Sequence, residues 1–162
     1  MERKMYKENR KMALQDAEKA FENNNHGILC VNGDDGYPYG VPVNYIYEDR
    51  KIYIHSAKYG YKIDAVKADN KVCFTSIINA EVIPHKFTAA YMSVIAKGTI
   101  RIVEDETERR HILEQYIYKM APDYIETGMK SVDASIARTE LLCIDVEELT
   151  GKANIDSSSD VK

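Results

Sequence analysis

The sequence predicts a mainly β domain, a small antiparallel barrel or sandwich of about six strands with a few helices around it. Short runs rich in β-branched and aromatic residues recur along the chain, and strands favour this composition. Glycine- and asparagine-containing turns separate the first of these runs, as they do in hairpins. Helical periodicity is confined to the start of the chain, a short stretch after residue 60 and a longer one after residue 105.

The N-terminal segment, up to about residue 24, is expected to be a helix. Leu14, Ala17 and Phe21 recur at helical spacing, with charged residues outside that stripe. The asparagine-rich run 23–27 then ends the helix.

Three strands are expected next, joined by tight turns at residues 32–36 and 48–50 into an antiparallel meander. They are Gly27–Val31, Tyr37–Tyr47 and Lys51–His55. Pro38 and Pro42 place the second strand at a sheet edge, at a bulge or at a strand start, because proline cannot donate a ladder hydrogen bond.

A short helix near residues 61–68 is expected to precede two further strands. The predicted pieces are a strand at Lys71–Ile78, a loop at Asn79–Lys86 and a long strand at Phe87–Val103. Gly98 inside the long strand indicates a bulge or bend of the kind that helps to close a barrel.

The C-terminal third is expected to hold a helix and one last strand. Asp105 and Glu108 form a pattern like a capping box at the start of the helix, which ends near Pro122. Residues 123–134 fit no single pattern, and Ala134–Val146 predicts the last strand. We expect a single domain over residues 1–153 and a disordered, Asp- and Ser-rich tail over residues 154–162.

Composition limits the functional classes. Hydrophobic residues make up 44% of the chain and charged residues 30%, and the net charge is −4 with scattered basic residues. Nucleic-acid binders concentrate lysine and arginine on one face, so we expect no nucleic-acid partner. No apolar run is long enough for a membrane span and the start of the chain is charged, so we expect a cytoplasmic protein without membrane contact.

The three cysteines are expected to be reduced and structural. Cys30, Cys73 and Cys143 each lie in an apolar strand-like run, and none forms a CxxC pair. A free cysteine often behaves as a small buried hydrophobe, and reduced thiols suit the cytoplasm. A catalytic thiol would need a basic partner, and the sequence shows none near these residues.

The stretch from His55 to Lys62 is the strongest candidate for a binding site. It follows the apolar run 52–54 and leads into the predicted helix. The N–H groups at a helix start carry partial positive charge and lack internal partners, so a phosphate can bind them. Ser56 adds a hydroxyl and Lys62 a charge. An ordinary strand-to-helix loop with a solvated lysine is the alternative.

Several short pieces of the chain occur in an order and spacing typical of one family. They are Gly36-Tyr37-Pro38-Tyr39, Pro42-Val43-Asn44-Tyr45, Ile54-His55-Ser56-Ala57, Gly60-Tyr61-Lys62 and Tyr91-Met92-Ser93-Val94-Ile95. On these pieces the chain resembles the FMN-binding split-barrel family of pyridoxamine 5′-phosphate oxidase and its relatives. It looks closest to the branch that contains nitroimidazole-resistance reductases. The resemblance runs from about Gly27 to Ala153 and implies a six-stranded antiparallel split β-barrel.

The resemblance also implies a homodimer with FMN at the subunit interface. In such a dimer, one strand would run beside the isoalloxazine ring, the end of a second strand would follow the ring and the ribityl-phosphate, and the helix start would hold the phosphate. The strand beside the ring would hold Val41, Pro42, Val43 and Asn44. The second strand would end in His55, Ser56 and Ala57, and the helix start would provide Tyr61 and Lys62. Thr75 would reach the ribityl chain, and Tyr91, Ser93 and Val94 would come from the long strand of the partner subunit.

Two departures from the oxidase proper affect this interpretation. The oxidase has an arginine early in the ring-contacting strand and another just before the phosphate lysine, where this chain has Val41 and Tyr61. Positive charge at the phosphate then falls mainly to Lys62, with Lys58 as a helper. The chain also lacks tryptophan and the arginine-rich C-terminal segment of the oxidase, so oxidation of pyridoxamine phosphate is not expected.

His55 is the candidate catalytic residue. At the end of a strand beside the flavin it could donate a proton to a reduced substrate, contact the cofactor or substrate, or make a structural hydrogen bond. His85 follows Pro84 in a loop, where a solvated role is expected. The four histidines show no metal-ligand spacing, so no metal site is expected.

The leading hypothesis is an FMN-dependent oxidoreductase that reduces a small, planar, electron-poor substrate such as a nitroaromatic. The electron donor is not evident, since the chain has no GxGxxG nicotinamide fingerprint. The alternatives are a flavin carrier or sensor without turnover and a related split barrel that handles haem.

Overall fold

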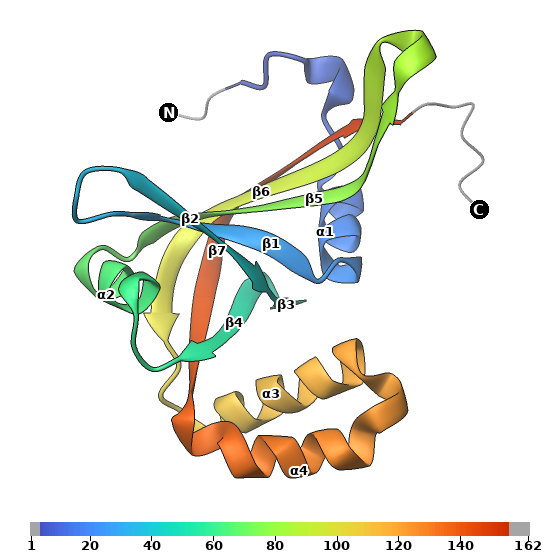
Figure 1. Cartoon of the computed structure of the whole chain (residues 1–162). Coiled ribbons are helices and arrows are strands. Elements are labelled where there is room, and N and C mark those ends of the chain that lie inside the picture. The colour runs from blue at the N-terminus through green and yellow to red at the C-terminus, as the bar shows by residue number, and fades with distance from the viewer. Residues whose placement is uncertain (1–3, 156–162) are drawn as a thin grey trace.

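The computed structural model describes residues 4–155 and contains one seven-stranded antiparallel sheet curled into a barrel, with helices outside it (Figure 1). The strands are β1 (His26–Asn32), β2 (Pro38–Asn44), β3 (Ile46–Glu48), β4 (Lys51–Ala57), β5 (Lys71–Ile83), β6 (Thr88–Ile102) and β7 (Thr139–Asn154). The α-helices are α1 (Leu14–Asn23), α2 (Tyr61–Ala68), α3 (Glu106–Met120) and α4 (Ile125–Ser135). Short 3₁₀ turns are η1 (Glu8–Arg10), η2 (Pro84–Lys86), η3 (Pro122–Tyr124) and η4 (Ile136–Arg138). The predicted mainly β class is confirmed.

The sheet has one strand more than predicted, because the expected strand Tyr37–Tyr47 breaks at Tyr45. The sheet order is β2-β1-β5-β6-β7-β4-β3, so β2 and β3 are consecutive in the chain but lie at opposite ends of that order. The two predicted hairpins are present, because β2 pairs with β1 and β3 pairs with β4. The middle strand is divided between them, so the three predicted strands do not form one continuous meander. The chain passes between the two sheet edges at Tyr45, which brings the edges together and closes the barrel.

Burial of Tyr45 explains the break. Its side chain is fully buried, its ring stacks on Phe21 with centroids 4.7 Å apart, and its hydroxyl donates to the carbonyl of Phe21 at 2.6 Å. Phe74 packs edge-on against both rings. The barrel centre is thus filled by side chains, and a large ligand must bind outside it. The prolines of β2 lie in an edge strand, which is one of the predicted positions.

The hairpin of β5 and β6 is longer than predicted and projects beyond the barrel (Figure 1). The expected loop Asn79–Lys86 is confirmed only for Pro84–Lys86, which form η2. Its first part belongs to β5, because pairing resumes after a bulge and runs from Glu81 opposite Ala90 to Ile83 opposite Thr88. The predicted irregularity at Gly98 is confirmed by a register shift between Lys97 and Gly98.

The segment between β6 and β7 forms a helical hairpin, α3 and α4, below β4 and β7 (Figure 1). The predicted cap is confirmed, because the Asp105 carboxylate accepts a 2.7 Å hydrogen bond from the backbone N–H of Glu108. The ambiguous stretch 123–134 mostly becomes α4, and β7 begins at Thr139 rather than at Ala134.

The ends of the described chain fall close to the predicted boundaries. The N-terminal helix begins only at Leu14, after η1. Asn154, predicted to open a disordered tail, is the last residue of β7, and residues 156–162 of that tail lie outside the described residues. No helix within residues 4–155 is long and apolar enough to cross a membrane.

Candidate functional site

The stretch predicted as the cradle forms the junction between β4 and α2. Gly60 precedes α2 with φ +121°, a conformation in which any other residue would be strained. Its carbonyl accepts from the N–H groups of Ile63 and Asp64 at 2.8 and 3.2 Å. No side chain caps α2, so the first N–H groups of the helix have no side-chain acceptor. The start of this helix can therefore accept an anion.

Ser56, near the end of β4, has a buried hydroxyl group without a partner. Its Oγ is the one buried side-chain nitrogen or oxygen within residues 4–155 that has no hydrogen-bond partner. Leaving such a group unsatisfied costs about 1–3 kcal/mol. A ligand that donates to or accepts from this hydroxyl would remove that cost.

Lys62 adds positive charge beside the same strand end. The side chain is half-buried, and desolvation lowers the pKa of its ammonium group. None of the ion pairs among residues 4–155 involves Lys62. A desolvated ammonium group without a carboxylate partner is suited to a phosphate from outside the chain.

His55 lies between the cradle and the helical hairpin. Although it is exposed, protein atoms around the ring desolvate it and, together with the charge of Lys62, lower the pKa of His55 below its ordinary value. The ring packs edge-on against Tyr116 of α3, with centroids 4.6 Å apart. At neutral pH His55 is therefore a neutral imidazole that can both donate and accept a hydrogen bond.

Tyr116 is a site residue that the sequence reasoning missed. Its hydroxyl donates to the carbonyl of Tyr53 at 2.7 Å and lies 3.2 Å from the carbonyl of Asn44, so it joins β4 to the end of β2. Burial raises the pKa of Tyr116, which keeps the phenol protonated. The sequence signal that could have found Tyr116 is the apolar stripe Ile112, Leu113 and Tyr116 of α3, all of which are buried.

A cavity of about 390 Å³ opens beside His55, between the barrel and the helical hairpin. Its walls are mainly apolar side chains of α3 and α4, and His55 and Asn44 provide polar groups at the barrel side. The lining residues are Asn44, His55, Leu113, Tyr116, Ile117, Met120, Ala121, Ser131, Val132, Ser135 and Thr139. This composition is typical of a pocket for a small, flat organic molecule.

Tyr61 is committed to a different contact from the one predicted. Its hydroxyl donates to the Asp34 carboxylate at 2.9 Å and accepts from the backbone N–H of Asp34 at 3.0 Å. Its ring packs edge-on against Tyr39. The side chain therefore fastens α2 to the turn between β1 and β2, and the group that Tyr61 offers to a phosphate is its backbone N–H at the helix start.

The predicted ring-contacting strand presents alternate residues to its two faces. Val41 and Val43 pack against the barrel core, whereas Pro42 is exposed on the outer face. Ile28 of β1 lies directly opposite both Pro42 and Thr75, so Pro42 and Thr75 are placed on one outer surface. Exposed Ala57 is the last residue of β4.

The residues predicted on the long strand lie far from the cradle within one chain. Ser93 pairs with Lys152 of β7, whereas His55 pairs with Leu141 of the same strand. This separation is roughly 36 Å of strand at about 3.3 Å per residue. Tyr91 pairs with Asn154, so it lies still further from the cradle than Ser93. A hydrogen bond with the Lys152 side chain lowers the pKa of the Tyr91 phenol.

Val94 is fully buried in the barrel core, so its side chain cannot contact a ligand at the surface. Only backbone groups of Val94 are compatible with the predicted cofactor contact.

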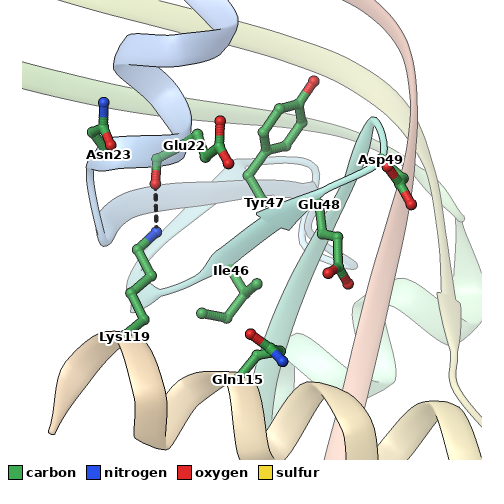
Figure 2. A pocket seen from close by; sticks show the side chains of 8 residues that line it. All are labelled: Glu22, Asn23, Ile46, Tyr47, Glu48, Asp49, Gln115 and Lys119. Carbon is green, nitrogen blue, oxygen red and sulfur yellow. Dashed lines mark hydrogen bonds between the residues drawn. The ribbon is translucent and has the colours of Figure 1, made fainter. Parts of the chain in front are cut away.

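A larger cavity of about 580 Å³ lies elsewhere, between the end of α1, β3 and α3 (Figure 2). It contains none of the predicted site residues. Lys119 points across it and donates to the carbonyls of Glu22 and Asn24 at 2.7 Å each. The ammonium group thus satisfies the C-terminal end of α1, which is a structural role.

A curled antiparallel barrel with a filled centre, a proline-bearing edge strand and an anion cradle on its outside defines the split-barrel class of proteins. Residues 15–153 match the family described as Pyridoxamine 5′-phosphate oxidase, and the chain belongs to this family. No curated protein matches the sequence.

Solved structures with low sequence identity share the fold. A candidate 5-nitroimidazole antibiotic resistance protein from Bacteroides thetaiotaomicron is 23% identical with a TM-score of 0.69, over 88% of this chain and 86% of that one. An FAD-binding protein from Mesorhizobium loti is 21% identical with a TM-score of 0.68, over 90% and 97%. The flavocytochrome Anf3 from Azotobacter vinelandii is 16% identical with a TM-score of 0.80, over 94% and 73%.

Proposed function

We propose that this protein is a homodimeric, FMN-dependent oxidoreductase that reduces a small, planar, electron-poor substrate such as a nitroaromatic. The observation that carries the proposal is the cradle itself. Around the junction of β4 and α2 lie the unsatisfied Ser56 hydroxyl, the ammonium group of Lys62, which has no ion-pair partner among residues 4–155, and the uncapped start of α2.

The residues present fit a flavin that ends in a single phosphate. Lys62 and the first N–H groups of α2 supply charge and donors for the phosphate, and Ser56 supplies a hydroxyl. The exposed surface around Pro42 and Thr75 offers an apolar wall for a flat ring. One cationic side chain at one helix start matches one terminal phosphate group, and this favours FMN over a dinucleotide.

The bound flavin would supply the redox chemistry of this reaction. His55 would hydrogen-bond the substrate and deliver a proton to it from its ring N–H. Tyr116 would orient the His55 ring through their edge-on contact, and the apolar walls of α3 and α4 would exclude water from the adjoining cavity.

The roles proposed for Tyr91 and Ser93 require a dimer. Tyr91 and Ser93 lie on β6, opposite Asn154 and Lys152 of β7, whereas His55 is opposite Leu141, so a second copy would have to bring Tyr91 and Ser93 to the cradle. The projecting hairpin also carries exposed apolar side chains: Ile77 is 59% exposed, Val82 71% and Phe87 98%. Side chains of this kind favour association with another copy.

The absorbance spectrum of the purified protein, followed by a turnover assay, tests the function. We expect flavin absorbance with quenched fluorescence, and oxidation of a reduced nicotinamide that depends on an added nitroaromatic. Flavin bound without turnover would identify a carrier or sensor, and a Soret band would identify a haem protein. Protein that neither retains nor binds added FMN would exclude the proposal.

Light scattering tests the dimer separately. We expect the mass of two chains for the unmodified protein and a shift toward one chain for Ile77→Glu. The matched control is Lys67→Glu, an exposed substitution on α2 away from the hairpin. A monomeric unmodified protein that still binds FMN tightly would overturn the shared site.

A further inference from the structure

Cys30 and Cys73 lie side by side on neighbouring strands. Cys30 of β1 is directly opposite Cys73 of β5 in an antiparallel ladder. The neighbours of each cysteine along its strand, such as Leu29 and Phe74, are buried in the barrel. Because side chains alternate between the two faces of a strand, both thiols point to the outer face of the sheet.

The spacing of this pair is compatible with a disulfide. Directly opposed residues in an antiparallel ladder have Cα atoms about 4.5–5.5 Å apart, and a disulfide spans roughly 4.4–6.8 Å. Both cysteines are free thiols and only partly buried. They line an open cavity of about 430 Å³ together with Lys71 and Lys97, so a small oxidant can reach them.

We propose that Cys30 and Cys73 form a redox-active dithiol that closes into an intrachain disulfide on reaction with a hydroperoxide. The thiolate of the first cysteine attacks the peroxide, the O–O bond breaks, and a sulfenic acid and an alcohol (water, for hydrogen peroxide) are formed. The second thiol then displaces water from the sulfenic acid to form the S–S bond. Two thiols lose two electrons and two protons, and the peroxide is reduced.

The surroundings assign the two roles. Cys73 lies opposite Lys97 of β6, whose ammonium group also pairs with Glu148 at 3.1 Å. The thiolate is the nucleophilic form of a cysteine. Burial and then the neighbouring Cys73 raise the pKa of Cys30, so its thiol stays protonated. Cys73 is thus the attacking residue and Cys30 the resolving one.

Cys143 provides an internal comparison. It is fully buried in β7, and burial raises its pKa to about 11. Its thiol should not react under the same conditions. The dithiol goes beyond the proposed function and does not depend on flavin binding.

Intact-mass measurement of the full chain after treatment with hydrogen peroxide tests the proposal. We expect a loss of about 2 Da, a single disulfide between the peptides that contain Cys30 and Cys73, and full reversal by dithiothreitol. Cys143→Ala should behave in the same way. Oxygen additions without this disulfide, or a disulfide between two chains, would overturn the proposal.

Two single variants test the assigned roles, with circular dichroism as the check of folding. In Cys30→Ser, a sulfenic acid at position 73 should persist and be trapped by dimedone. In Cys73→Ser, labelling of position 30 should be at least tenfold lower. Equal labelling of both variants, or stronger labelling of Cys73→Ser, would overturn the order of attack.

Discussion

Replacing Lys62 with alanine tests the cradle most directly. We expect Lys62→Ala to weaken FMN binding strongly and to leave riboflavin binding almost unchanged, because riboflavin lacks the phosphate. The ammonium group is half-buried and has no carboxylate partner within residues 4–155, so its removal leaves no unpaired acid behind. The loss therefore reports the contact with the ligand.

The size of the effect follows from the kind of contact. A hydrogen bond to a charged group contributes about 1.5–3 kcal/mol, and each 1.4 kcal/mol is a factor of ten in affinity. We expect a roughly 10- to 150-fold increase in the Kd for FMN. The backbone N–H groups of α2 and the Ser56 hydroxyl should retain the remaining affinity.

The assay is a fluorescence-quenching titration of the flavin-free protein with FMN and with riboflavin, at two salt concentrations. Lys67→Ala is the matched control, since Lys67 lies in the last turn of the same helix and is exposed. An equal loss of affinity for both flavins, or the same loss in the control variant, would refute the assignment of Lys62 to the phosphate.

Three further predictions follow from the contacts described above. The pKa of His55, measured by NMR titration, should lie below the ordinary histidine value. It should rise in Lys62→Ala but stay below that value, because burial also lowers it. An unchanged pKa in this variant would contradict the coupling of the two side chains. Phe21→Ala should lower the free energy of unfolding by about 3–5 kcal/mol in urea, because it removes the ring that packs against Tyr45 and Phe74. Gly98→Ala should lower the Tm, since a Cβ there would lie 2.0 Å from the carbonyl oxygen of Asp145; a Tm equal to that of the unmodified protein would show that the bulge adapts.

The lowered pKa of His55 also makes the stability of the fold depend on pH. Its folded pKa is lowered, so the unfolded chain binds the proton more tightly than the folded one. The contribution of His55 to stability therefore increases as the pH rises through the window below about 6.5. Bound phosphate would offset the charge of Lys62, and the pKa of His55 should then rise.

Local patterns predicted the class of fold and the junction of β4 with α2. They did not predict the route that the chain takes from one strand to the next. The strand pattern of residues 37–47 is continuous, and only the burial of Tyr45 against Phe21, far away in sequence, breaks it. The loop predicted at residues 79–86 has a polar, irregular composition, yet its backbone pairs because β6 lies beside it. In both cases tertiary contacts override the local preference.

In the candidate site, too, local patterns indicate some residues and tertiary contacts determine the others. His55, Ser56 and Lys62 all lie within the stretch 55–62, so one motif was enough to propose them. Tyr116 comes from a helix more than fifty positions later, and its role depends on the packing of that helix against β4. The pair Cys30 and Cys73 was likewise hidden, because its meaning lies in the register between two strands.

Tyr61 shows why the cradle need not copy its relatives. Where the oxidase proper has an arginine, this chain has a phenol that hydrogen-bonds twice to Asp34 and packs against Tyr39. These contacts hold the turn between β1 and β2 against the start of α2. The chain therefore lacks the positive charge of the arginine, but the position of its helix start is fixed by Tyr61. In the proposed site, the N–H groups of this helix start would be held in place before the phosphate binds, which reduces the ordering cost of binding. The affinity for a phosphate then rests on Lys62 and on the rigid helix start, and Tyr61→Phe should weaken FMN binding only through the loss of that rigidity.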